Sequence, residues 1–186
     1  MAVQFSYIKR ALNNSIKEFL DRDKYLLEKN VSERAISHKI ASYLEDEFGS
    51  FYDVDCEFNR NASNEAELKK ILVIHNEIKE LPGIKSNPRI HEIDGEEYYE
   101  FSVYPDIIVH KRGRSNRNIL IIEIKKSNSS ITKDYDYCKL KAYTDSKYND
   151  LKYQYGAFLS FNMATMSCSN IEWFKDGKTI ELSSFS

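Results

Sequence analysis

The sequence predicts a single α/β domain built around a mixed sheet. Apolar residues recur at three- and four-residue spacing through the first fifty residues, which is typical of amphipathic helices. Further along, two-residue alternation and an almost wholly apolar run at 119–124 indicate strands. Helical and strand patterns then alternate along 186 residues, a length that suits one domain with its own core.

Two helices are expected at the start of the chain. The apolar face of the first consists of Tyr7, Ile8, Leu12, Ile16, Phe19 and Leu20. The second is expected over 31–48, with Asn30 as its N-cap, Glu33 as the capping-box partner and Gly49 as its stop. Its apolar stripe consists of Ile36, Ile40, Tyr43, Leu44 and Phe48.

The pattern then changes to strands with one further helix between them. Alternating polar and apolar residues predict a strand over 53–58, broken at 59–61. A helix is expected over 64–81, ended by Pro82-Gly83. The stretch 89–110 has strand character, with Asp94-Gly95 as a hairpin turn.

The second half of the chain is expected to supply the centre of the sheet. A polar connection at 111–118 leads into 119–124, whose branched apolar residues suit a strand buried on both faces. A helix over 134–148 and a strand over 155–161 follow. Asp176-Gly177 is a two-residue hairpin signal near the end of the chain.

The composition excludes several classes of protein. With six glycines the chain has no Gly-rich phosphate loop, and its four histidines include no zinc-binding pattern. Cys56, Cys138 and Cys168 form no C-x-x-C pair, which predicts free thiols in a reducing compartment. The sequence has no apolar leader segment and no membrane-length apolar run, so a cytoplasmic location without membrane contact is expected.

The charge is unevenly distributed along the chain. Residues 111–150 contain ten Lys and Arg against five acids, whereas the rest of the chain contains 17 basic and 24 acidic residues. A basic region of this kind favours a polyanionic partner such as nucleic acid. An ordinary solvated surface accounts for the charge pattern equally well.

One polar residue stands where the pattern requires an apolar one. Glu123 interrupts the run at 119–124, and Lys125 follows two positions later, which puts both side chains on one face of a strand. Burying a carboxylate is costly unless it is paired or binds a metal. A salt bridge between the two residues at the strand end is the structural alternative.

A second carboxylate favours the metal over the salt bridge. Asp106 lies in another apolar strand segment, directly after Pro105, which marks a strand edge or bend. If this strand pairs with 119–126, Asp106 comes near Glu123. Two facing carboxylates repel each other, and a hard divalent cation such as Mg²⁺ resolves the repulsion. Lys125 would then lie beside the metal, able to hold a phosphate oxygen or the attacking water.

Pro105-Asp106 followed by Glu123-Ile124-Lys125 resembles the motif of the PD-(D/E)XK nuclease superfamily. The triplet alone has little value, since [DE]-x-K occurs six times here, but only Glu123 lies in a buried-type strand downstream of a Pro-Asp. The resemblance covers about 31–161. It implies the restriction-endonuclease-like fold: a mixed central sheet flanked by helices with core order α-β-β-β-α-β, extended here by an N-terminal helix and a C-terminal hairpin. The helix expected over 64–81 departs from the minimal pattern.

The resemblance also implies a function and a set of residues. It implies a Mg²⁺-dependent nuclease, with Mn²⁺ as a substitute and DNA as the expected substrate, in which Asp106, Glu123 and Lys125 are catalytic. The implied metal ligands are Asp106, Glu123, the Ile124 carbonyl and, from the helix over 31–48, Glu33. The basic residues expected to contact substrate are Lys126, Lys139 and Lys141.

Two other classes of protein stay open. The same fold with a vestigial acid cluster could bind nucleic acid or a protein partner without catalysis. An unrelated α/β domain with chance motifs is the third alternative. The sequence does not decide between DNA and RNA as substrate, or between endo- and exonuclease action. A homodimer or a protein partner also stays open.

Overall fold

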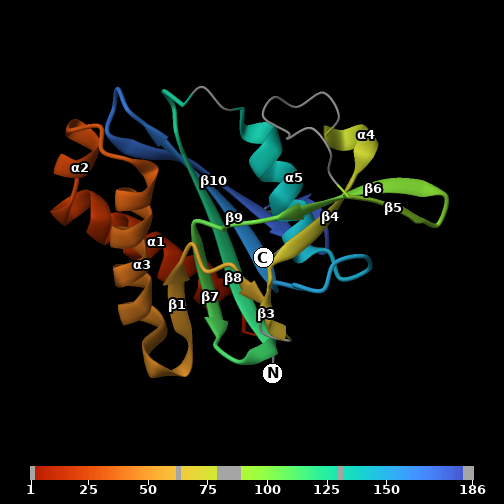
Figure 1. Ribbon diagram of the computed structural model, residues 1–186. Helices are drawn as coiled ribbons and strands as arrows, with labels where there is room; N and C mark the ends of the chain where they lie inside the picture. Colours follow the sequence, from red (N-terminus) through yellow and green to blue (C-terminus); the bar gives the residue numbers. More distant parts are fainter. Residues whose placement is uncertain (1–2, 62–63, 79–88, 130–131, 182–186) are drawn as a thin grey trace.

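The computed structural model describes residues 3–61, 64–78, 89–129 and 132–181. It confirms the α/β class: a mixed six-stranded sheet and a three-stranded antiparallel sheet, with helices packed against them (Figure 1). The six strands have the order β1-β7-β8-β9-β10-β11, in which only β8 and β9 are parallel among the described pairs. The bounds of these strands are β1 Asp53–Cys56, β7 Ile107–Lys111, β8 Arg114–Lys126, β9 Tyr155–Asn162, β10 Ser167–Lys175 and β11 Lys178–Ile180.

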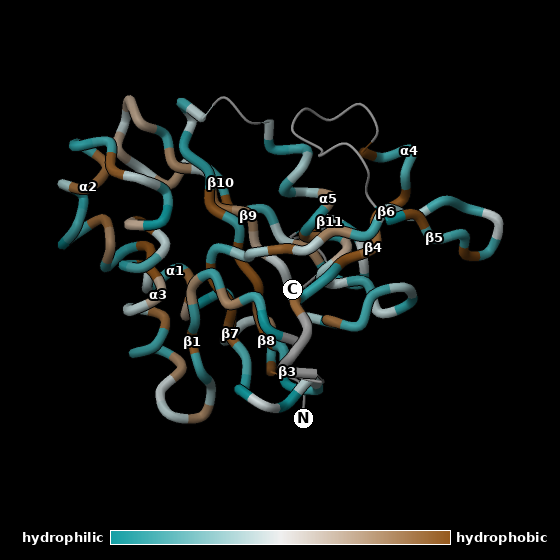
Figure 2. Tube along the Cα trace, viewed as in Figure 1, coloured by the Kyte–Doolittle hydropathy of each residue, from teal (hydrophilic) through white to brown (hydrophobic). Residues whose placement is uncertain are grey.

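Helices cover both faces of the six-stranded sheet. The longer helices α1 and α3 pack on one face, and α5 packs on the other (Figure 1). Hydrophobic residues lie along the central strands, while much of the projecting β5–β6 hairpin is hydrophilic (Figure 2). The helix bounds are α1 Phe5–Arg22, α2 Tyr25–Glu28, α3 Glu33–Phe48, the 3-10 turn η1 Gly49–Phe51, α4 His75–Ile78 and α5 Lys133–Thr144.

Strand β8 is the centre of the molecule and contributes to two separate cores. Its even-numbered residues Leu120, Ile122 and Ile124 join the core beneath α1 and α3. Ile121, on the opposite face, joins the core beneath α5. Glu123 and Lys125 share the parity of Ile121, so they project toward α5, as the alternation of a strand requires.

The helix expected over 64–81 is wrong for 64–78, and its last residues 79–81 lie outside the described residues. Instead this segment contains β3 Asn64–Leu68, β4 Lys70–Ile74 and the single turn α4. In β4 the buried residues Ile71 and Val73 alternate with less buried ones, and the strand pairs with β6 Glu96–Ser102, whose other neighbour is β5 Arg89–Ile93. This tertiary pairing outweighs the helical propensity of the Glu- and Lys-rich residues. Strand β3 pairs with the short β2 Arg60–Asn61, and Pro82-Gly83 lie outside the described residues.

The N-cap of the second long helix is also different from the one expected. Ser32, not Asn30, precedes α3 in an extended conformation, and its hydroxyl oxygen accepts from the Ala35 N–H at 3.4 Å. Asn30 has a φ of +50° and ends the turn of α2, a left-handed conformation that Asn tolerates well. Glu33 therefore has no capping-box role and is free to reach the sheet. Gly49, with a φ of +58°, ends α3 as expected.

The expected hairpins are confirmed, and one connection is shorter than expected. Asp94-Gly95 and Asp176-Gly177 form two-residue turns in which all four residues have positive φ. The polar segment 111–118 is a two-residue turn at 112–113 followed by the first residues of β8. Helix α5 ends at Thr144, four residues before the predicted boundary. No helix in the described part of the chain is long and apolar enough to span a membrane.

Candidate active site

The pairing of β7 with β8 brings Asp106 to Glu123. These strands are antiparallel, and Ile107 lies opposite Ile122, so Asp106, one residue before β7, lies next to Glu123 in the register. Asp106 Oδ2 accepts from the Ile124 N–H at 2.7 Å. Because the N–H and C=O of one strand residue point to the same neighbour, the Ile124 carbonyl is directed to the Asp106 side of β8.

Helix α5 supplies the partners of Glu123. The Lys139 ammonium donates to Glu123 Oε2 at 2.8 Å, and the Tyr143 hydroxyl donates to Oε1 at 3.2 Å. Residues four apart lie on one helix face, which explains why both reach the same carboxylate. Glu123 is 2% exposed, and its burial raises its pKa to about 8 against the opposing effect of the Lys139 charge.

Asp106 has an unfavourable environment for a carboxylate. Burial raises its pKa to about 6, although the hydrogen bond from Ile124 and the charge of Lys139 act in the other direction. The charges of Asp136 and Glu33 add to the rise, and the charge of Asp106 in turn raises the pKa of Glu123. Burial is therefore the main cause of both raised pKa values, and the neighbouring carboxylates add to it.

Asp136 is a member of the site that the sequence did not reveal. Its Oδ1 lies 2.9 Å from Lys139 Nζ, and its Oδ2 lies 3.0 Å from Lys125 Nζ. The Lys125 contact is not aligned as a hydrogen bond, so Oδ2 is buried without one. Among the described ion pairs, Lys125 therefore pairs with Asp136 and not with Glu123, contrary to the salt-bridge alternative. The one available signal is the 136–139–143 spacing, which shares a helix face.

The remaining predicted residues differ in their distance from this cluster. Glu33 Oε1 accepts from the Lys126 N–H at 2.9 Å, and its charge reaches Asp106, so Glu33 lies at the same end of β8. The Lys126 ammonium donates to Asn30 and Val31, at 2.8 Å each, and fastens β8 to the start of α3. Lys141 lines a cavity of about 230 Å³ on another side of α5.

A second buried polar group lies at the other end of β7. His110, 1% exposed, pairs through Nε2 with Asp55 Oδ2 at 2.8 Å, and Arg112 pairs with the same carboxylate. Lys69 lies nearby, 2% exposed, with its ammonium donating to the Phe58 carbonyl at 2.9 Å. Burial lowers the pKa of Lys69 to about 7. This group joins Lys69, the residue before β4, to Phe58, and it lies at the opposite end of β7 from Asp106.

The donor set of the acid cluster fits a hard divalent cation. Asp106, which is half-buried, and Glu123, which is buried, are adjacent carboxylates with raised pKa values, and the buried Asp136 Oδ2 lacks a hydrogen bond. In the arrangement seen, no three His, Cys, Asp or Glu side chains of the described residues converge as a metal-binding group. Mg²⁺ needs only one or two protein carboxylates, since water and phosphate complete its shell. The pair is therefore sufficient in chemistry and number.

These features define an α/β protein with a buried carboxylate–lysine cluster between its central strands and one helix. Comparison with protein-family models gives no match, and neither does comparison with curated proteins. The chain is similar to a solved structure described as "Crystal structure of SSO0001", at 15% sequence identity and a TM-score of 0.31. The similarity covers 98% of this chain and 81% of that one.

Proposed function

We propose that this protein is a Mg²⁺-dependent nuclease with the restriction-endonuclease-like fold, acting on DNA. The observation that carries the proposal is the meeting of Asp106 and Glu123 on paired central strands, with Lys125 on the same face. The order α3, β1, β7, β8, α5, β9 agrees with the α-β-β-β-α-β core. The strands β2 to β6 and the turn α4 then form an insertion between the first two core strands.

Asp106 and Glu123 would hold the metal, with the Ile124 carbonyl and Glu33 as further ligands. A bound divalent cation lowers the pKa of a coordinated water and neutralises charge that develops on the phosphate. Burial raises the pKa of both carboxylates, because it destabilises their ionised forms. A positive charge between them would stabilise these ionised forms. Their placement is therefore better suited to a loaded site than to an empty one.

The lysines of the cluster supply the remaining positive charge. Lys125 would hold the attacking water or a phosphate oxygen, and Asp136 keeps its ammonium on the site side of β8. Hydrolysis of a phosphodiester needs such preorganised charge around the phosphate more than it needs a covalent intermediate. The basic segment 111–150 contributes β8 and α5, the two elements that frame the cluster, which favours a polyanionic substrate.

One observation favours a second candidate, a nucleic-acid-binding module without catalysis. Both oxygens of Glu123 are already engaged, and Lys125 and Lys139 balance much of the acid charge without any metal. A cluster that is satisfied by its own lysines would suffice to brace α5 against the sheet. In this case nucleic acid would bind without being cut.

The test is cleavage of a panel of duplex, branched and single-stranded DNA and of RNA, with Mg²⁺, with Mn²⁺ and with chelator. We expect metal-dependent cleavage of DNA that Glu123→Gln and Asp106→Asn reduce by about a hundredfold or more. Glu96→Gln, the same change on the exposed β5–β6 hairpin, should leave cleavage unchanged. Binding of DNA without cleavage of any substrate by the wild-type protein would favour the module instead.

A further inference from the structure

We infer that the Lys139 ammonium is an internal counter-ion that occupies the cation's place in the metal-free protein and must move when a metal binds. This inference rests on the proposed metal site and concerns its regulation. It assigns to Lys139 a role before substrate arrives, in addition to the phosphate contact expected from the sequence.

The contacts of Lys139 are those of a bound cation more than those of a surface lysine. Its ammonium lies 2.8 Å from Glu123 Oε2 and 2.9 Å from Asp136 Oδ1, bridging a strand and its own helix. The side chain is 12% exposed, and the two carboxylates it bridges are 3% and 5% exposed. Hydrogen bonds between such desolvated ions are the strong ones.

A metal bound by Glu123 would have to share its carboxylate with these contacts. Tyr143 holds Oε1 and Lys139 holds Oε2, so each oxygen of the proposed ligand already accepts a hydrogen bond. A divalent cation between Asp106 and Glu123 would also stand beside the positive charge of Lys139. Metal and ammonium therefore compete for one carboxylate, and each weakens the binding of the other.

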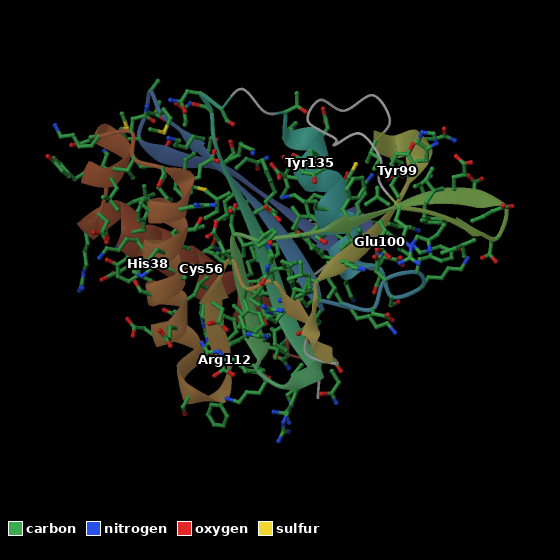
Figure 3. All side chains as sticks on the ribbon, viewed as in Figure 1. His38, Cys56, Tyr99, Glu100, Arg112 and Tyr135 are labelled. Carbon is green, nitrogen blue, oxygen red and sulfur yellow. The ribbon has the colours of Figure 1, made fainter. Side chains whose placement is uncertain are left out.

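Two groups on α5 would hold the Lys139 ammonium after it leaves Glu123. Asp136 stays within reach from the same helix face, and the Tyr135 ring lies under the ammonium at 5.3 Å, in cation–π range. Tyr135 is half-buried and lies in the first turn of α5 (Figure 3). From there the ammonium could contact a phosphate, so metal loading would switch Lys139 from an acid-bound to a substrate-facing position.

The decisive experiment measures Mn²⁺ binding by electron paramagnetic resonance of the free ion, without any nuclease assay. If Lys139 competes with the metal, Lys139→Met should bind Mn²⁺ about tenfold more tightly than the wild-type protein, because the charged hydrogen bond from Lys139 to Glu123 no longer has to be broken. Lys139→Arg keeps the charge and should not gain affinity. Lys141→Met removes the same charge from another side of α5 and should also leave affinity unchanged.

Unchanged or weaker Mn²⁺ binding by Lys139→Met would overturn the inference. If that variant fails to fold, Lys139→Gln replaces it, and ¹⁵N-lysine NMR of the wild-type protein provides a second measurement. The protected Lys139 ammonium signal should disappear or shift when Mg²⁺ is added, and a signal that Mg²⁺ leaves unchanged would refute the displacement.

The same titration separates this inference from the proposed function. If wild-type protein binds Mn²⁺ and Glu123→Gln does not, the metal site stands, and the Lys139→Met result alone decides the inference. If only Lys139→Met binds Mn²⁺, the competition is supported in its strongest form. If neither protein binds Mn²⁺, both the metal site and the inference fail.

Discussion

Replacing Asp106 by Asn should stabilise the metal-free protein at neutral and alkaline pH. The pKa of Asp106 is raised from 3.8 to about 6. The ionised carboxylate therefore destabilises the folded state relative to the unfolded state when the pH is above that value. A shift of about two units corresponds to about 3 kcal/mol. Asn keeps an oxygen that can accept from the Ile124 N–H, but this neutral hydrogen bond is weaker by roughly 1 kcal/mol. The expected net gain is about 2 kcal/mol above the folded-state pKa.

The sign of the effect gives it a characteristic pH dependence. Below pH 3.8 the carboxyl is protonated in both states, and its contribution to wild-type stability is fully present. That contribution is lost as the pH rises through about 6. Asn does not ionise, so the stability of Asp106→Asn does not change with pH at this position. The two proteins should therefore diverge between these values.

Urea unfolding at a series of pH values measures this divergence. Asp176→Asn, the same change at an exposed turn, should show no such gain. Addition of Mg²⁺ should raise the stability of the wild-type protein and leave Asp106→Asn unchanged, because metal binding stabilises only the state that holds it. A loss of stability in Asp106→Asn at alkaline pH, or a gain independent of pH, would show that Asp106 is a structural partner of Ile124 and not a strained metal ligand.

Two further predictions concern residues outside the acid cluster, Lys69 and Gly156. The pKa of Lys69 is lowered from 10.5 to about 7 by burial, so Lys69→Met should be more stable than wild type below pH 7, by up to about 5 kcal/mol before the lost bond to Phe58 is subtracted. This advantage should disappear in urea unfolding as the pH approaches 10.5, and an advantage that does not change with pH would contradict the assignment. At Gly156 of β9, where a Cβ would lie 3.2 Å from atoms of Leu140 and Phe174, Val should lower the unfolding free energy by about 1–3 kcal/mol. An unchanged melting temperature of Gly156→Val would show that α5 is not seated closely on β9.

The sequence contained enough to predict the central strands and their acids. The 119–124 part of strand β8 is almost wholly apolar, so one acid within it is conspicuous, and the same holds for Asp106 after Pro105. The hairpin turns could also be predicted, because Asp-Gly pairs favour the positive φ that such turns need. These features depend on local pattern alone.

The features that the sequence did not predict depend on tertiary contacts. Strand β4 is five residues long and becomes a strand by pairing with β6, so its neighbouring Glu and Lys residues suggested a helix. Asp136 and Tyr143 resemble ordinary positions of an amphipathic helix until α5 is seated on β8 and β9. Glu123 pairs with Lys139 because α5 packs on β8 and β9. The spacing of Glu123 and Lys125 does not predict this pairing.

Anomalous diffraction from crystals soaked in Mn²⁺ tests the proposed metal site most directly. We expect a Mn²⁺ peak between the carboxylates of Asp106 and Glu123 that is absent from crystals of Glu123→Gln. A structure at high Mn²⁺ concentration in which the Lys139 ammonium still bridges Glu123 and Asp136, with no peak at Asp106, would contradict it.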